Sequence, residues 1–186
     1  MTFNNFNIFP KSIGLSLIEL ISSTAILATI TSVAIPSFNT YIERSQIKSS
    51  SIQLRSILSL ARQNAISTGQ DTYVCELINE TDCNTHRPFK ANWSHGWLAY
   101  NDNNNNAELD ANDTIIQIHK NTSKVGVIFN QRGRLRFRAN GSARSAGFYL
   151  CTKDSARHIL VLYSGRTRSK NLEDEERIKL CQQKLQ

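Results

Sequence analysis

Residues 14–36 read GLSLIELISSTAILATITSVAIP, and this stretch decides how the rest of the chain is organised. From Leu15 to Ile35 there are 21 residues with a single charged side chain, Glu19. A helix of that length spans about 30 Å, the thickness of the hydrocarbon core of a bilayer. No later stretch of the chain is comparably apolar, so the sequence predicts one membrane-spanning helix near the N-terminus.

The processing site indicated by the sequence lies before the apolar run. An ordinary secretory signal is cut behind its apolar segment, next to small residues. Here the junction is Gly14 followed by Leu15, and the polar leader in front of it carries Lys11. Cleavage after Gly14 would remove residues 1–14 and leave the apolar helix in the mature protein.

Glu19 is the unusual residue of the apolar run. A carboxylate inside a bilayer costs about 2.5–3.5 kcal/mol on insertion scales, so it requires a positively charged partner. The nearest candidate is the α-amino group that cleavage would create on Leu15, in the same or a neighbouring subunit. Glu19 is therefore predicted to set the register between adjacent helices. The alternative is an ordinary signal anchor in which Glu19 has no role.

Behind Pro36 the pattern stays helical but becomes amphipathic. Apolar residues recur at a helical period from Phe38 to Ile66, and Gly69 is a suitable stop. Short segments of strand-forming residues follow, separated by glycine turns. The predicted strands are Thr72–Leu77, Gly96–Asn101, Thr114–His119, Val125–Asn130, Leu135–Arg138, Gly147–Thr152 and His158–Tyr163. This order predicts an α+β fold, with antiparallel β-sheet packed on one long helix.

The predicted organisation has four parts. They are a leader (1–14), a transmembrane and assembly helix (15–36), an amphipathic helix that continues into the globular domain (37–68) and a β-rich head (69–186). The last residues, 171–186, are rich in Glu and Lys and are compatible with either a short helix or a tail.

The chain has four cysteines and no Cys-x-x-Cys pair, which disfavours a zinc ribbon. An even number of cysteines behind a membrane-targeting segment favours two disulfides in an oxidising compartment. Of the three available pairings, the sequence-local one, Cys75–Cys83 with Cys151–Cys181, is favoured. Reduced, buried thiols are the alternative.

Positive charge is concentrated in one stretch. From Arg132 to Lys170 there are ten basic residues and one acidic residue, Asp154, whereas the net charge of the whole chain is +7. Two runs stand out, Gly133-Arg134-Leu135-Arg136-Phe137-Arg138 and Gly165-Arg166-Thr167-Arg168. Alternate residues of an extended chain share a face, so each run would place its guanidinium groups together. Such groups suit nucleic-acid phosphates; the alternative is a solvated face that only keeps the protein soluble.

The N-terminal motif Gly14-Leu15-Ser16-Leu17-Ile18-Glu19-Leu20 resembles the class III leader junction of type IV pilins and pseudopilins. In that family prepilin peptidase cuts after the Gly and methylates the new N-terminus. The residue after the cut is usually Phe, where this chain has Leu15, and Pro36 lies where such helices commonly carry a kinking proline. The resemblance implies the type IV pilin fold, a single-pass inner-membrane protein with a periplasmic head, and assembly with other pilins.

Later motifs resemble the FimT/GspH group of minor pilins and H-type pseudopilins. They are Val74-Cys75, Cys83, Trp93-Ser94-His95-Gly96-Trp97, Asp102, Phe129 with Gly133-Arg134, Phe148-Tyr149-Leu150-Cys151 and Ser164-Gly165-Arg166-Thr167-Arg168. The last of these resembles the DNA-binding motif of FimT-type pilins that take up DNA in natural transformation. We therefore expect a minor pilin that binds the DNA backbone through Arg134, Arg136, Arg138, Arg157, Gly165, Arg166, Arg168 and Lys170. The alternative is an H-type pseudopilin of a type II secretion system without nucleic-acid binding.

No catalytic signature is present: the sequence lacks Gly-x-Ser-x-Gly, a Walker loop and paired carboxylates. We expect no enzyme activity, no cofactor and no metal site; a signal-anchored periplasmic enzyme is the remaining alternative. Asp102–Asp113 has oxygens at alternate positions, as a calcium loop does, but Ala107 stands where a Gly is needed. An Asn-rich turn is predicted there, and calcium binding is the minor alternative. Trp93 and Trp97 are predicted to pack in the core.

Overall fold

The computed structural model of the chain describes residues 14, 16–84, 92–153 and 155–172, together with residues 179, 181 and 183. Within the helix, the side chains of residues 33–37 are outside the description. Leu15 and nearly all of the predicted leader, residues 1–13, also lie outside the described residues. So does most of the C-terminal segment, 171–186: residues 171 and 172 are described as strand, and residues 179, 181 and 183 as helix.

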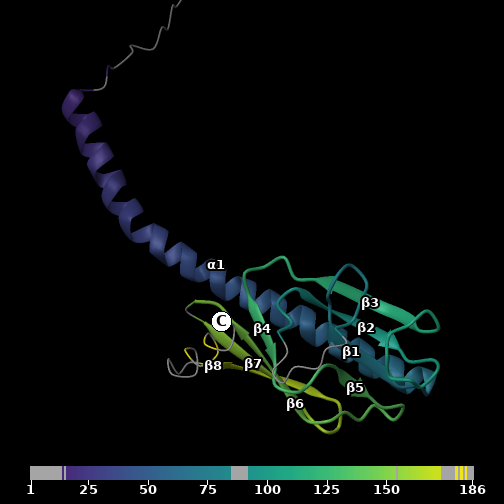
Figure 1. Cartoon of the computed structure of the whole chain (residues 1–186). Helices are drawn as coiled ribbons and strands as arrows, with labels where there is room; N and C mark the ends of the chain where they lie inside the picture. The colour runs from purple at the N-terminus through teal and green to yellow at the C-terminus, as the bar shows by residue number, and fades with distance from the viewer. Residues whose placement is uncertain are drawn as a thin grey trace, which may run out of the picture. The chain divides into compact units, whose positions relative to one another are not determined.

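One helix, α1 (Leu17–Thr68), carries the N-terminal part of the described chain (Figure 1). The chain divides into two compact units, Met1–Asn39 and Thr40–Gln186, and α1 contributes to both. Gly69 ends the helix with a φ of +68°, and its amide donates to the carbonyl of Ala65 over 3.1 Å. Within the described residues, no helix reaches the length and apolarity that are needed to cross a membrane.

The described part of the head contains eight strands in two antiparallel four-stranded sheets (Figure 1). The first sheet has the order β3-β2-β1-β5 and the second has the order β4-β6-β7-β8. The strands are β1 (Thr72–Glu76), β2 (Gly96–Asn101), β3 (Thr114–Lys120), β4 (Gly126–Phe129), β5 (Leu135–Phe137), β6 (Ala146–Cys151), β7 (Ala156–Val161) and β8 (Thr167–Leu172).

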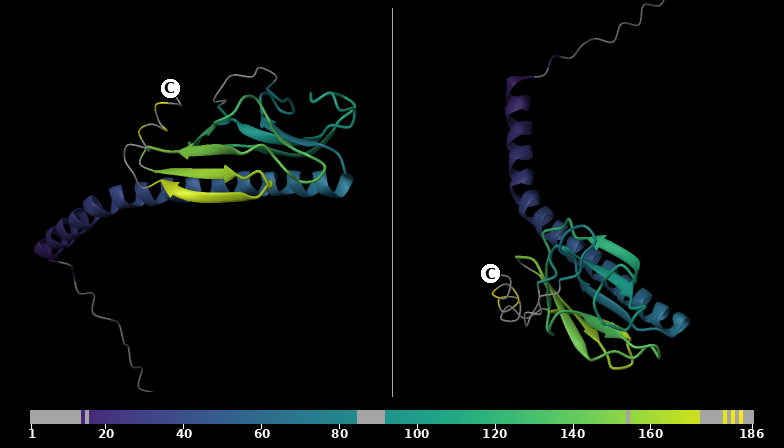
Figure 2. Two further views of the ribbon diagram at one scale, coloured as in Figure 1. Left: turned by 90° about the horizontal axis from the view of Figure 1, so that it is seen from below. Right: turned by 45° about the vertical axis from the view of Figure 1, so that its right-hand side comes forward.

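A single apolar core joins both sheets to the C-terminal half of α1. Ala61 and Ala65 of the helix are fully buried, and their small side chains let both sheets approach the helix closely. The same core contains Trp97 from the first sheet and Phe148 from the second. Both sheets lie on the same side of this half of the helix (Figure 2). The predicted α+β fold, with antiparallel β-sheet packed on one long helix, is therefore confirmed.

Both tryptophans are fully buried, as predicted. The ring of Trp93 lies 4.9 Å from the rings of Phe129 and Phe148, between the strands of the second sheet. Trp97 stacks on His119 of the neighbouring strand at 4.7 Å. Aromatic side chains thus fill the space under each sheet, and neither indole is available for stacking on a nucleic-acid base.

Two features of the sheets were not predicted. The predicted strands form two sheets, because β5 leaves its sequence neighbours β4 and β6 and pairs with β1. The strand β8 was not predicted because TRSKNL contains few β-branched or aromatic residues. Hydrogen bonds to β7 form it nevertheless, and Leu172 at its end is buried.

Each sheet carries one disulfide. Cys75–Cys83 lies against the first sheet, with the Cα atoms 5.7 Å apart. Cys151–Cys181 joins the end of β6 to the C-terminal segment, with the Cα atoms 6.2 Å apart. The structure therefore contains the sequence-local pairing that the sequence favoured.

Candidate nucleic-acid interface

The run that contains Arg166 and Arg168 lies on the β7–β8 hairpin. The Leu162 amide donates to the Arg166 carbonyl over 2.9 Å, and the Gly165 amide donates to the Leu162 carbonyl over 2.8 Å. Gly165 has a φ of +74°, a left-handed conformation that side chains disfavour. The turn leads directly into β8, the edge strand of the second sheet.

Three basic side chains form a row on the outer face of this sheet. Residues that lie opposite each other on antiparallel strands share a face. Arg168 lies opposite Leu160, and Lys170 lies opposite His158. The core residues Ile159 and Val161 alternate with these positions and point to the other face. We call Arg166, Arg168 and Lys170 the β8 row; all three side chains are exposed.

Aromatic rings flank the β8 row. His158 stacks almost parallel on Tyr149 of β6, with the ring centroids 4.3 Å apart. Tyr163, at the hairpin turn, is 68% exposed. The β7–β8 hairpin therefore combines cationic side chains with one exposed ring, that of Tyr163, a combination suited to polyanionic nucleic acid.

Arg157 does not belong to this row. It lies opposite Leu150, a fully buried core residue, and therefore on the inner face of β7. Its Nε donates to Oδ1 of Asn171 over 2.9 Å. The structure thus separates Arg157 from the other predicted DNA-binding residues of this sheet.

The other arginine run lies on β5, the edge strand of the first sheet. Leu135 and Phe137 are buried, so Arg134, Arg136 and Arg138 point away from the core, as the alternation predicts. We call these three arginines the β5 row. Each of them has a partner within the head.

The partners of the β5 row hold its guanidinium groups in place. Arg134 lies over the ring of Tyr73, 5.3 Å from its centroid, and burial raises the pKa of that phenol. Arg136 forms an ion pair with Asp71. Nη1 of Arg138 lies 3.4 Å from Oγ of Ser142, at the edge of hydrogen-bond distance.

Arg62 of α1 connects the hairpins that carry the two rows. Its Nε donates to the carbonyls of Gly141 (3.2 Å) and Ser164 (3.1 Å). A Cβ atom placed on Gly165 would lie 2.1 Å from the Gly141 carbonyl oxygen, so the two turns touch. Sequence reasoning missed Arg62, because its partners are 79 and 102 residues away along the chain.

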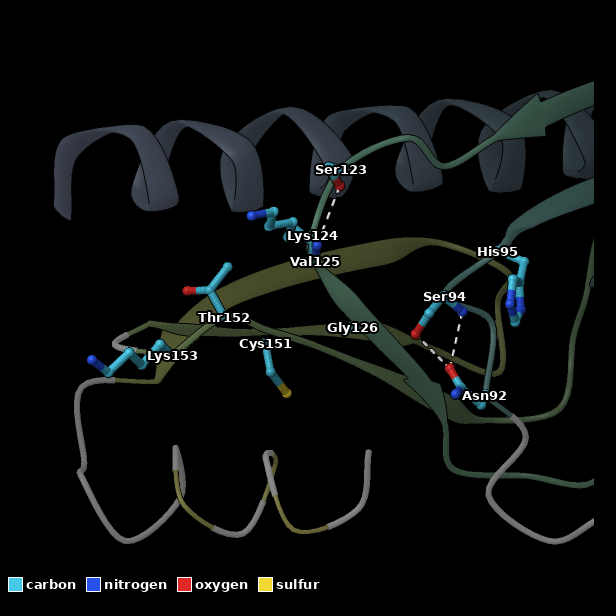
Figure 3. Close-up of a pocket in the computed structure, with 10 residues that line it drawn as sticks. All are labelled: Asn92, Ser94, His95, Ser123, Lys124, Val125, Gly126, Cys151, Thr152 and Lys153. Atoms are coloured by element: carbon cyan, nitrogen blue, oxygen red, sulfur yellow. Dashed lines mark hydrogen bonds between the residues drawn. The ribbon is translucent and has the colours of Figure 1, made fainter. Parts of the chain in front are cut away.

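A pocket with a volume of about 610 Å³ lies elsewhere, beside β4 (Figure 3). Its polar groups are engaged in local structure. The Val127 amide donates to Oγ of Ser94, and Oγ of Ser123 donates to Oδ1 of Asn121 over 2.6 Å. In the described chain, neither the Ser94 nor the Ser123 hydroxyl is hydrogen-bonded to His95.

The Asn-rich loop after β2 is held by its own carboxylates. Asp102 accepts hydrogen bonds from the amides of Asn106 and Ala107, and Asp113 accepts from the amides of Asn103 and Asp110. These oxygens cap turns rather than converge on one point. In the described residues, no group of three His, Cys, Asp or Glu side chains could hold a metal ion.

The N-terminal end of α1 presents an exposed apolar surface. Leu17 and Ile18 are 76% and 70% exposed, and Glu19 lies in the first turn. Gly14 is exposed. Leu15, the other half of the predicted cleavage junction, lies outside the described residues.

A long helix whose C-terminal half packs under antiparallel sheets, with exposed apolar residues near its N-terminal end, defines a pilin-like protein. Two crystal structures of the type IV minor pilin FimU of Pseudomonas aeruginosa (strain PAO1) have this fold. One is 17% identical, with a TM-score of 0.52 over 68% of this chain and 98% of FimU. The other is 17% identical, with a TM-score of 0.51 over 70% and 96%.

The family follows from the sequence itself. Residues 51–165 match the family described as Type II transport protein GspH, and the chain belongs to this family. The predicted membership of the FimT/GspH group is thereby confirmed. No curated protein matches the chain. The family match ends at Gly165, so the β8 row lies just beyond it.

Proposed function

We propose that this chain is a minor type IV pilin that binds DNA non-specifically and serves DNA uptake in natural transformation. The observation that carries the proposal is the β8 row. Within the described residues, the side chains of Arg166, Arg168 and Lys170 form no ion pair or hydrogen bond. All three are exposed, Arg168 and Lys170 on the edge strand β8 and Arg166 directly before it. A row of unpaired cations is available to phosphates of any sequence.

The β5 row and the turns around Gly165 and Gly141 support this reading. The turn that contains Gly141 follows Arg138, and the turn that contains Gly165 precedes Arg166. Because these two turns touch, the β5 row and the β8 row can bind one nucleic-acid backbone. Neutralising phosphates releases counterions, and log K then falls by about 0.9 per phosphate for each tenfold rise in salt on duplex DNA. The expected binding is therefore independent of sequence and steeply dependent on salt.

Assembly through α1 is the second part of the proposal. Six Ser and Thr hydroxyls between Ser22 and Ser32 donate to helix carbonyls three or four residues earlier, at 2.7–3.0 Å. Hydroxyls satisfied in this way make the helix surface compatible with lipid or with other helices. The mature helix would then anchor the chain in the inner membrane before it joins other pilins, with a periplasmic head.

Processing by prepilin peptidase after Gly14 would supply the partner of Glu19. The new α-amino group of Leu15, methylated by the same enzyme, would pair with the Glu19 carboxylate of a neighbouring subunit. Mass spectrometry of the native protein tests this step, and a mature N-terminus at Leu15 is expected. A protein that still carries Met1, or is trimmed behind Ile35, would exclude pilin-type processing.

DNA binding is tested with the full mature chain in mild detergent. Fluorescence anisotropy would be recorded with two duplexes of unrelated sequence at several salt concentrations. We expect equal affinities for both duplexes. Arg166→Gln with Arg168→Gln should weaken binding at least tenfold at low salt and lower the salt slope by about 1.8, or 0.9 for each lost phosphate contact.

The matched control removes the same charge from another surface. Arg44 and Arg55 are exposed residues of α1, and Arg44→Gln with Arg55→Gln also removes two positive charges. This variant should bind within about twofold of the parent. If both double variants weakened binding equally, net charge alone would explain the affinity, and the β8 row would not be the site.

A second candidate function is favoured by the family match, whose description names type II transport. In this reading the chain is an H-type pseudopilin of a secretion system, and its basic rows only keep the head soluble. Absence of any DNA binding by the parent, even at low salt, would support this function over the first.

A further inference from the structure

A cavity lined with arginines lies at the end of the first sheet. Its volume is about 200 Å³. One wall is β5, and the other is formed by the segments that precede β5 and β6. Its floor consists of Phe129, Leu135 and Ala146, all buried core residues. Five guanidinium-bearing side chains surround it: Arg132, Arg134, Arg136, Arg138 and Arg144.

The cavity carries an uncompensated positive charge. Its lining, as far as the described residues form it, contains no carboxylate. Asp71, the ion-pair partner of Arg136, is not part of the lining. Arg132 and Arg144 are exposed and form no hydrogen bond or ion pair within the described chain. At least two guanidinium groups are thus free to meet a ligand.

The arrangement suits one particular form of phosphate. A guanidinium binds phosphate oxygens through two parallel N–H donors, and several such forks favour a multiply charged group. A phosphodiester carries one negative charge, whereas a phosphomonoester carries about 1.5 to 2 at neutral pH. The apolar floor also lowers the local dielectric and strengthens these contacts.

We propose that this cavity binds the terminal phosphate of a DNA strand, an inference that rests on the proposed DNA binding. A concave pocket can hold the end of a DNA strand, whereas the β8 row on an open sheet face can contact the backbone along the strand. Arg138 belongs to both the cavity and the turn that adjoins Gly165. The cavity therefore adjoins the surface proposed for the backbone.

The test compares two duplexes of identical sequence, one with 5′-phosphates and one with 5′-hydroxyls. With the full mature chain in detergent, the phosphorylated duplex should bind about tenfold more tightly, as charge-assisted bonds to a dianion imply. Arg132→Gln with Arg144→Gln should abolish this preference and leave the affinity for the hydroxyl duplex within about twofold. The control, Arg166→Gln with Arg168→Gln, should weaken both duplexes and keep their ratio.

The outcomes separate the two proposals. Equal affinities of the parent for both duplexes would overturn the cavity proposal and leave DNA binding intact. If neither duplex bound, the proposed function would fail, and inorganic phosphate would then be the probe. A rise in melting temperature with phosphate that is lost in Arg132→Gln with Arg144→Gln would support an anion site; no rise would overturn it.

Discussion

The two sheets of the head have the same construction and differ in how they hold their arginines. Each has four antiparallel strands, one disulfide and an arginine-bearing edge strand. On β5 the guanidinium groups are held by Tyr73, Asp71 and Ser142. On β8 and in the turn before it, they form no hydrogen bond or ion pair within the described residues. The same alternating pattern therefore yields a fixed cationic site on one sheet and an adaptable one on the other.

The difference has a physical origin in the strand environment. β5 lies next to β1, whose outward residues include an aromatic ring and whose preceding residue is Asp71. β8 lies next to β7, whose residues opposite Arg168 and Lys170 are Leu160 and His158, and neither of these is a carboxylate. Fixed guanidinium groups suit a ligand of defined shape, and unpaired ones suit a backbone that can lie in many registers.

The largest expected effect on stability comes from the disulfides. Cys151–Cys181 closes a loop of 30 residues and Cys75–Cys83 one of 8. From loop-closure entropy, we expect the free energy of unfolding to fall by about 3.5 kcal/mol in Cys151→Ser with Cys181→Ser. In Cys75→Ser with Cys83→Ser it should fall by about 2.5 kcal/mol. Urea unfolding, followed by tryptophan fluorescence, would measure both. Equal losses of unfolding free energy in the two variants would show that the stabilisation by each disulfide does not depend on the length of the loop that it closes.

The contact between the two hairpins is tested by Gly165→Ala. The new Cβ would collide with the Gly141 carbonyl, and the alanine would have an unfavourable φ. We therefore expect the free energy of unfolding to fall by roughly 3 kcal/mol. Gly69→Ala is the control, because its φ is +68° but no atom lies within 4 Å of the added Cβ. Strain alone should cost that variant about 1 kcal/mol. Similar losses in urea unfolding would argue against a tight contact.

The contrast between fixed and free arginines predicts opposite responses. Arg134→Gln with Arg136→Gln should lower the free energy of unfolding by about 1 kcal/mol, since a cation–π contact and a partly exposed ion pair are lost. Arg166→Gln with Arg168→Gln should change it by less than about 0.5 kcal/mol. Calorimetry of both variants checks this, and a destabilised β8 variant would show that its arginines have structural partners.

The smallest effect concerns a buried carboxylate of the first sheet. Glu76 is 7% exposed and accepts a hydrogen bond from Nδ2 of Asn84 over 2.7 Å. Burial raises the pKa of Glu76 above its ordinary 4.5, so the folded state binds this proton more tightly than the unfolded state does. Its contribution to stability is therefore present at low pH and lost as pH rises from about 4.5 through the raised pKa.

Glu76→Gln should remove that dependence on pH and stabilise the head at neutral pH by less than about 1 kcal/mol. Thermal melts between pH 4 and pH 7 would compare the variant with the parent. Parallel pH profiles for the two proteins would show that the Glu76 carboxylate titrates in the folded state as it does when unfolded.

Local patterns predicted most of the fold. The 3.6-residue period and Gly69 indicated the helix and its end, and β-branched runs such as Thr72–Leu77 indicated strands. Patterns could not indicate which strands pair, because β5 joins β1 across about sixty residues. They also missed β8, whose residues have weak strand propensity and depend on pairing with β7.

Part of the candidate site could be predicted from the sequence, because local patterns also determine which face of a strand a side chain occupies. Alternation within each run placed the arginines of the β5 and β8 rows correctly on outward faces. It gave no information on Arg157, whose orientation depends on the register of β7 with β6. Arg132 and Arg144 gain their significance only from the cavity, because the sequence pattern does not show that residues 129–138 and 144–146 surround one space.

The two bonds from Arg62 have a mechanical consequence. A DNA strand held at Arg166 would pull on the β7–β8 turn, and the Ser164 carbonyl next to it is bonded directly to the helix. Tension would therefore reach α1 through a side chain as well as through the strands of the sheet. This direct connection to the helix would stabilise the hairpin against opening when its turn is pulled.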